Sequence, residues 1–216
     1  MTRSAPNRLV PVVAIPEIRD YERINAELVR YLDTGHGQVR LAGAEGQRLL
    51  VAGLAGGWNA VVEVEGCAGP ELAADLDAPG LTVVCRGPAA DGAARGLRSG
   101  RVVILDDAGA ALGYAQQGGQ VVASRGVGPR AGLNQRGGVL VVLGPAGPLA
   151  GERQAGGLLF AFGDRLGPHV GRGRRGGRLV QLGSEGDGLA GVAAEEAETF
   201  RSLLRDLDAW LRAGPE

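Results

Sequence analysis

The chain has 216 residues, of which 44% are apolar and 4% aromatic, and its formal net charge is −1. This apolar content excludes a disordered tail, and the small net charge offers no general attraction to nucleic acid or to an anionic membrane. All 23 basic residues are arginines, which excludes Schiff-base chemistry on lysine and any phosphate-binding loop that depends on a lysine.

Glycine is the unusual component, with 39 residues. Ordering glycine is entropically costly, so a chain retains this many only where the backbone requires them. Neither the every-third-residue pattern of collagen nor the composition of a flexible linker fits, because valine-rich runs separate the glycines. We therefore expect a core of Val, Leu, Ile and Ala on a glycine-dependent backbone.

The first 35 residues are predicted to form an N-terminal extension that ends in a helix over residues 17–32, with Pro16 at its start. The apolar positions that share one face of this helix are Ile18, Tyr21, Ile24, Leu28 and Leu32. Residues 9–15 are apolar but are interrupted by Pro11 and carry no cleavage signature. No apolar run is long enough to span a bilayer, so we expect a cytoplasmic protein with reduced thiols.

A repeat of 19 or 20 residues dominates residues 36–188, which we assign to one domain. A small-residue pair ending in glycine opens each unit, and a short apolar run follows most of these pairs. Two further glycines recur in register within each later unit. The glycines that define the register are Gly109, Gly113, Gly119, Gly128, Gly132, Gly138, Gly147, Gly151, Gly157, Gly167, Gly171 and Gly177.

This repeat predicts an all-β solenoid, a parallel β-helix of about seven turns. The apolar runs are short and β-branched, which is typical of strands, and the rest of each unit is too short for a crossover helix. One such unit cannot bury its apolar face alone, so the units must stack. We expect the recurring glycines at corners where φ is positive and no side chain fits. The alternative is a β-sandwich with glycine-rich turns, which does not keep a fixed period.

Residues 189–216 are predicted to carry a C-terminal amphipathic helix over residues 193–212. Its apolar stripe consists of Phe200, Leu203, Leu204, Leu207, Trp210 and Leu211. The open ends of a solenoid need cover, so both helices are expected to cap the stack, with partner binding as the alternative for each.

The histidines and cysteines, which are often catalytic or metal-binding residues in proteins, are far apart in this sequence. His36 and His169 each lie in a glycine-rich turn without a nucleophile or acid nearby in sequence, so we interpret them as loop residues. Cys67 and Cys85 differ in strand phase, which favours two structural thiols over a redox pair. Two cysteines and two histidines would all have to converge to build a four-ligand zinc site.

The other motifs have ordinary structural interpretations. Residues 171–176 match the dinucleotide-binding pattern of glycines, but a strand and not a helix is predicted to follow, so we interpret the match as coincidence. Asp106 with Asp107 and Glu195 with Glu196 are acid pairs at a strand end and a helix start, where solvated charge is expected. The sequence thus predicts no catalytic, cofactor or metal site.

One basic feature is retained as a possible partner interface. One polar residue precedes the second glycine of several units by two positions, and further arginines crowd the last turn. The candidate interface residues are Arg98, Gln117, Arg136, Arg172, Arg174 and Arg175. They are expected to form a polar ladder along one face, which is either a solvated edge or a docking surface for an acidic partner.

Residues 78–104 and 136–157 resemble the GXGXG domain family. The first segment is similar to the family's turn that ends in glycine and continues into a Val-rich strand, and the second is similar to the turns that follow. The N-terminal helix, with Ile24, Asn25 and Leu28, is similar to stand-alone members of the family. The departures are Ala73 at a corner and Asp106 after a strand, where glycine is usual, and they leave the subfamily open.

The resemblance implies a right-handed parallel β-helix and protein partners. In glutamate synthase the domain is non-catalytic and holds an amidotransferase domain against an FMN-containing synthase domain. We therefore expect a cytoplasmic scaffold subunit of a glutamate-synthase-like complex, without a cofactor of its own. The alternative is the analogous structural subunit of a formylmethanofuran dehydrogenase or of a formyltransferase/hydrolase-type complex. A third alternative, a β-helix carbohydrate-active enzyme, is disfavoured because the chain has few aromatics and no ladder of acids.

Overall fold

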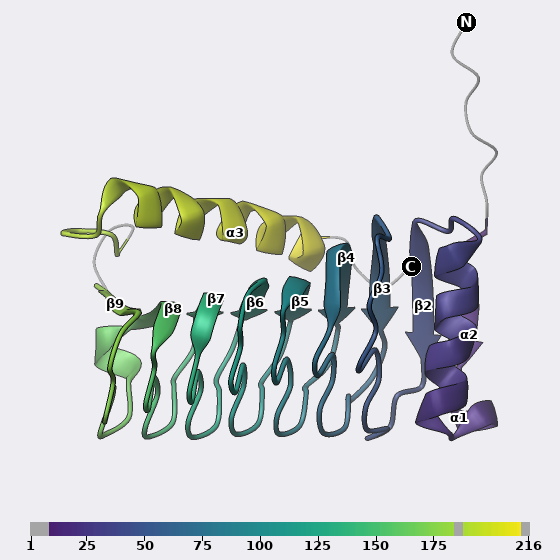
Figure 1. The fold of residues 1–216 in the computed structure, drawn as a ribbon, viewed down its shortest axis with the longest axis horizontal. Helices are drawn as coiled ribbons and strands as arrows, with labels where there is room; N and C mark the ends of the chain where they lie inside the picture. Colours follow the sequence, from purple (N-terminus) through teal and green to yellow (C-terminus); the bar gives the residue numbers. More distant parts are fainter. Residues whose placement is uncertain (1–8, 184–187, 213–216) are drawn as a thin grey trace, which may run out of the picture.

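The computed structural model describes residues 9–183 and 188–212 and shows one nine-stranded, all-parallel sheet in which the strands follow chain order (Figure 1). The predicted parallel β-helix of about seven turns is confirmed. The strands are β1 (Val12–Ala14), β2 (Gln38–Ala42), β3 (Ala60–Val64), β4 (Asp77–Cys85), β5 (Ser99–Ile104), β6 (Gln120–Ala123), β7 (Arg136–Val142), β8 (Gly156–Phe162) and β9 (Arg178–Leu182). A short 3-10 helix, η1 (Gly163–Arg165), follows β8.

Alternate residues of each strand point into the solenoid and stack from turn to turn. One inward column pairs Val83, Val102, Val121 and Leu140 in successive strands, and each of these side chains is buried. Their spacing of 19 residues is the period seen in the sequence. The interior is aliphatic because a turn this narrow leaves room for Val, Leu, Ile and Ala side chains but for few rings.

A second column of single parallel bridges joins successive turns beyond the strands. It runs through Ala68, Ala89, Ala108, Val127, Ala146 and Leu166. After each bridge residue the backbone takes positive φ at three alternating positions, for example at Ala111, Gly113 and Ala115. These left-handed residues turn the chain back toward the next strand, and they explain why the fold depends on residues that tolerate such a backbone.

The recurring glycines serve two different purposes. Gly113 and Gly138 have φ of +65° and +72°, as the sequence predicts for corners. Gly109 and Gly128, which belong to another column, do not have positive φ. A larger residue is excluded there because a Cβ would have no space. A Cβ on Gly128 would lie 2.7 Å from the backbone nitrogen of Ala110, so no side chain fits between these turns.

Two helices at the N-terminus replace the single predicted helix. They are α1 (Ile15–Ile18) and α2 (Tyr21–Asp33). The chain breaks at Arg19, which has φ of +55°, and Asp20 then accepts a hydrogen bond from Glu22 N at 2.9 Å as the N-cap of α2. Strand β1, which precedes both helices, joins the sheet beside β2, although the sequence predicted no strand there.

The predicted cap at the N-terminal end is confirmed for α2. Its Ile24, Leu28 and Leu32 are buried in the same apolar cluster as the solenoid interior. The buried side chain of Asn25 supplies polar partners: its Nδ2 donates to Leu49 O at 2.9 Å, and its Oδ1 accepts from Val51 N at 2.9 Å. The helix therefore covers the apolar interior and also satisfies backbone groups of the adjacent turn.

The C-terminal helix, α3 (Ala194–Arg212), has the predicted span, but the expectation that it caps the stack is wrong. It folds back along the outer face of the sheet, from β9 toward β4 (Figure 1). There Phe200, Leu203 and Leu207 pack in one apolar cluster with an outward-facing column of the sheet. That column consists of Val84, Val103, Val122, Val141, Phe160 and Val180.

The helix and the apolar column match in length. A helix of 19 residues is about 28 Å long at 1.5 Å per residue, and six strands spaced by about 4.8 Å cover nearly the same distance. On β2 and β3 the same outward column holds Arg40 and Glu63, so it becomes polar beyond β4. The run of apolar residues from β4 to β9 in this column lies where α3 covers it, which explains why α3 lies on the flank.

Candidate protein-interaction surface

The candidate ladder is a real column, which we call the stripe: Arg98, Gln117, Arg136, Ala155 and Arg175. The backbone nitrogen of Gln117 donates to Leu97 O at 2.8 Å, and those of Arg136 and Arg175 donate in the same way to Gln116 O and Gln154 O. Ala155 occupies the same position in its turn and interrupts the polar run. The side chains therefore follow one another at the strand spacing of about 4.8 Å.

The charged members of the stripe are exposed and have no ion-pair partner in the described part of the chain. Arg98, Arg136 and Arg175 are all exposed, and none of them has an ion-pair partner among residues 9–183 and 188–212. A guanidinium group in this state can donate two parallel hydrogen bonds to a carboxylate of another molecule.

A buried glutamine ladder lies directly behind the stripe, and the sequence analysis missed it. Gln116, Gln135 and Gln154 are fully buried. Gln135 Nε2 donates to Gln116 Oε1 at 3.2 Å, and Gln154 Nε2 donates to Gln135 Oε1 at 3.0 Å. Each amide also donates to backbone carbonyls of its own turn and the next, as Gln135 does to Leu158 O. The signal in the sequence was Gln in the same phase of three successive units.

This ladder gives the stripe a rigid base. Each buried amide has several hydrogen bonds, so neither the side chain nor the corner that it braces can rotate freely. The outermost acceptor, Gln154 Oε1, is buried without a hydrogen-bond partner among the described residues. The ladder therefore ends one turn before the sheet does.

The arginines of the last turn fall into two groups. Arg165 donates to Leu143 O at 3.0 Å and lies over the ring of Phe162, and Arg178 pairs with Glu196 at 2.9 Å. Both are therefore engaged in holding the fold. Arg172 and Arg174 are exposed, and no ion pair within the described part of the chain involves them. This second group, together with Arg175 of the stripe, is available to a partner.

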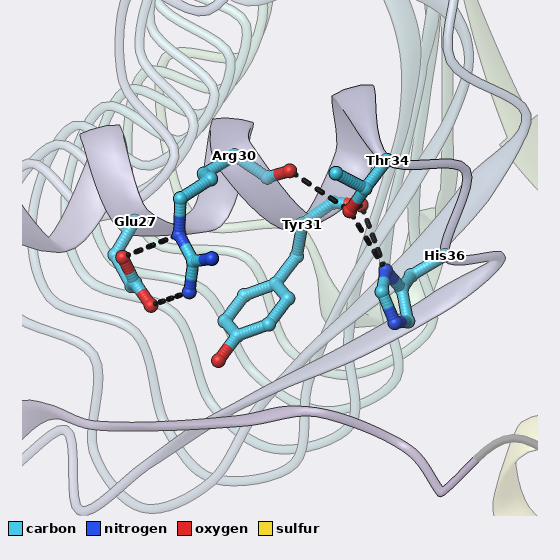
Figure 2. A network of polar contacts seen from close by, with 5 residues as sticks. All are labelled: Glu27, Arg30, Tyr31, Thr34 and His36. Atoms are coloured by element: carbon cyan, nitrogen blue, oxygen red, sulfur yellow. Dashed lines mark hydrogen bonds and ion pairs between the residues drawn. The ribbon is translucent and has the colours of Figure 1, made fainter.

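The two histidines are structural or exposed, as the sequence indicated. His36 closes the turn after α2: its Nδ1 lies 3.1 Å from both Tyr31 O and Thr34 Oγ1 (Figure 2). Its ring meets the ring of Tyr31 edge-on at 5.5 Å, and Arg30 pairs with Glu27 on the same helix. His169 is an exposed residue of the last turn with φ of +63°.

The two cysteines differ in exposure and in chemistry. Cys67 is exposed and Cys85 is buried, and both are free thiols. Cys85 Sγ donates to Gly87 O at 3.2 Å, and burial raises the pKa of this thiol from 9.0 to about 11. A thiol with a raised pKa stays protonated near neutral pH and is a poor nucleophile, so Cys85 is a structural residue.

The acid pairs hold turns and helices in place. Asp107 Oδ1 accepts a hydrogen bond from Gly126 N at 2.8 Å in the next turn, and Asp106 lies 3.3 Å from Arg125. Glu196 is buried and paired with Arg178, so the expectation that it is a solvated charge at a helix start is wrong. The ion pair fastens the start of α3 to β9.

The remaining glycine motif and an open groove bring no set of catalytic side chains together within the described residues. Residues 171–176 lead into β9 and not into a helix, as predicted from the repeat. An open groove of about 610 Å³ lies over the starts of β4 to β6. Three of its polar side chains are already paired: Ser99 donates to Asp77 at 2.7 Å, and Arg101 pairs with Gln120 and Asp206.

Two kinds of feature are absent from the described residues. Residues 9–183 and 188–212 contain no group of three or more His, Cys, Asp or Glu side chains placed to hold a metal ion. Within the same ranges, no helix combines the length and apolar character needed to cross a membrane.

Comparison with known proteins adds no relative. No family model, no curated protein and no solved structure matches this chain. The surface geometry is therefore the basis for a functional proposal.

Proposed function

We propose that this chain is a non-catalytic scaffold subunit of a glutamate-synthase-type complex, in which it holds an amidotransferase subunit against an FMN-dependent synthase subunit. The observation that supports the proposal is the stripe, whose Arg98, Arg136 and Arg175 are exposed without ion-pair partners among the described residues. Arginine is enriched at protein interfaces and pairs well with carboxylates.

The rigidity of the stripe makes it suitable for docking. Its backbone is held by turn-to-turn hydrogen bonds of 2.8 to 2.9 Å, and the glutamine ladder braces the corners behind it. A surface that is already ordered loses little conformational entropy when a partner binds. The solenoid can therefore present fixed charges over several turns, which is what a scaffold for two partners requires.

The test is co-purification of the tagged chain from the cells that naturally produce it. We expect an amidotransferase subunit and an FMN-binding synthase subunit, identified by mass spectrometry. The double variant Arg98→Glu with Arg136→Glu should lose both subunits. Its free energy of unfolding should change by no more than about 0.5 kcal/mol, the small range typical of surface changes. The matched control reverses Arg23 and Arg212, exposed arginines of α2 and α3, and should keep the partners.

Two outcomes would contradict the proposal. If the stripe variant retained the same subunits as the wild-type chain, the stripe would be a solvated edge and not the docking surface. If formyl-transferring or formyl-hydrolysing subunits co-purified in place of the expected pair, the chain would belong to the alternative complex.

A further inference from the structure

The two ends of the solenoid differ in how they are covered. At the N-terminal end α2 covers the interior, and Asn25 satisfies backbone groups of the adjacent turn. At the C-terminal end β9 is the last strand of the sheet, and α3 leads away from it along the flank (Figure 1). Within the described residues, no element lies over the last turn as α2 lies over the first.

Backbone N–H groups that donate hydrogen bonds to the following turn elsewhere in the solenoid have no following turn to donate to at its end. In the turn before, Ala146 N donates to Arg165 O, Leu149 N to Pro168 O, and Arg153 N to Arg172 O, at 2.8 to 2.9 Å. The same three columns hold corresponding bonds in the preceding turns. Their members in the last turn are Leu166, His169 and Gly173, whose N–H groups have no acceptor among residues 9–183 and 188–212.

Backbone acceptors are left open in the same turn. The carbonyls of Ala146, Ala150 and Gln154 each receive an N–H from the following turn. The equivalent carbonyls of the last turn are those of Leu166, Val170 and Arg174, which receive none from the described part of the chain. The end of the stack thus offers donors and acceptors in the spacing that another turn of chain would satisfy.

The charge of this end is mainly positive, since residues 163–183 contain five arginines and one acid, Asp164. Arg172, Arg174 and Arg175 are exposed beside His169. Because a second copy of this chain would bring the same arginines face to face, like-charge repulsion disfavours pairing through two such ends. At the opposite end of another copy α2 packs over the interior, and the sheet edge there is the three-residue strand β1, which disfavours stacking of one copy on another. A segment with carboxylate side chains has neither difficulty.

We propose that the C-terminal end of the solenoid binds an acidic segment of a partner protein, which adds to the stack as a further turn. Backbone hydrogen bonds to Leu166, His169 and Gly173 supply the affinity, by analogy with strand addition to a sheet edge, and the arginines select acidic side chains. Because each earlier turn is left-handed at three positions here, glycine at such positions of the segment favours binding. This inference shares with the proposed function only the premise that the chain has a protein partner.

The experiment uses the purified full chain and a fluorescein-labelled synthetic peptide that alternates Gly and Glu, because glycine can adopt the left-handed backbone of a further turn. A peptide that alternates Gly and Lys has the same backbone freedom and the opposite charge, and is the peptide control. Fluorescence anisotropy measures binding, and NMR amide exchange reports on Leu166, His169 and Gly173. We expect the acidic peptide to bind, added salt to weaken binding, and exchange at those three amides to slow.

Variants locate the site on the solenoid. Replacing Arg172 and Arg174 together by Ala should weaken binding of the acidic peptide by roughly tenfold or more. Replacing Arg23 and Arg212 by Ala removes the same charge from α2 and α3, away from both surfaces, and should leave binding unchanged. No complex is needed for this measurement, so its failure would leave the scaffold proposal intact, and failure of the scaffold proposal would leave this one intact.

Several results would overturn the inference. They are absence of acidic peptide binding at low salt, equal binding of the Lys peptide, and unchanged affinity after loss of Arg172 and Arg174. Binding without slower exchange at the three amides would also contradict it, because contact would then be electrostatic and would not involve backbone hydrogen bonds to the last turn. A dimer by analytical ultracentrifugation that protects the same amides would make a second copy the occupant.

Discussion

At the scale of single residues, equivalent positions in successive turns show which residues the corner of the solenoid tolerates. The position of Gly113 in its turn is taken by Ala94 and Ala73 in earlier turns, and all three have positive φ, between 52° and 65°. A Cβ there is compatible with the fold at the cost of a left-handed backbone. The position of Gly138 adds a second restriction, because a Cβ would lie 2.4 Å from Gly118 O.

We predict that Gly138→Ala and Gly113→Ala differ sharply in stability. At Gly113 the nearest atoms to a new Cβ are side-chain atoms at 3.4 Å, so the left-handed backbone costs about 1–2 kcal/mol. At Gly138 the clash with backbone adds to that, and we expect a loss above about 3 kcal/mol. Urea denaturation of both variants beside the parent measures the difference. Equal midpoints for the two variants would show that space between turns does not restrict Gly138.

Cys85 provides a prediction about alkaline pH. Burial raises the pKa of its thiol to about 11, so the folded chain holds the proton more tightly than the unfolded chain does. The resulting stabilisation is complete below pH 9 and is lost as pH rises from about 9 to 11, by roughly 2–3 kcal/mol. Cys85→Ala leaves a pH-independent cavity cost, so the stability difference between the parent and Cys85→Ala should shrink over this interval. A difference that stays constant up to pH 11 would mean that the buried thiol does not titrate with unfolding.

At the scale of secondary-structure elements, α3 is part of the folded unit and not an appendage. Its apolar side covers the outward column of the sheet, with the ring of Phe200 5.4 Å from that of Phe160. Polar anchors lie along its length, since Arg86 donates to Trp210 O at 3.1 Å and Arg178 pairs with Glu196. Removing the helix would expose a continuous row of valines, which is typical of an aggregation-prone surface.

We predict that Phe200→Ala destabilises the whole chain by about 3–5 kcal/mol, the usual range for a large buried aromatic side chain. Leu211→Ala, in the same helix but 52% exposed, is the matched control and should change stability by less than about 0.5 kcal/mol. Circular dichroism at helix and strand wavelengths should show one transition in both variants. Loss of the helix signal alone in Phe200→Ala, with the strand transition unchanged, would show that the solenoid folds without α3.

At the scale of the whole molecule, the chain is a short rod with one covered end and one open end among its described residues. Each turn contacts mainly its neighbours, so the rod gains length without a larger core. Binding capacity therefore resides on its outside: the stripe along one flank and the unpaired edge at the C-terminal end. The two surfaces meet at Arg175, which belongs to the stripe and to the last turn, so two partners could be held side by side.

The sequence by itself determined the repeat and hence the fold. The step of 19 residues, the β-branched runs and the glycines in register allow only stacked parallel strands, and the columns through Val83, Val102 and Val121 follow that period. The stripe was also predictable, because residues one period apart must lie beside each other in adjacent turns. Local patterns of this kind need no knowledge of distant contacts.

Only the tertiary structure decided where α3 lies, why the glycines differ and which arginines are unpaired. An apolar helical stripe covers a solenoid end or its flank equally well, and the length of the outward valine column settled the choice. Gly109 and Gly138 look alike in sequence. The space available for a Cβ at each is set by atoms of the preceding turn, which only the folded chain places there. Arg178 and Arg174 are both charged residues of the last turn, and only the position of Glu196 on the returning helix neutralises one of them. These features depend on contacts across the sequence, which a local pattern does not contain.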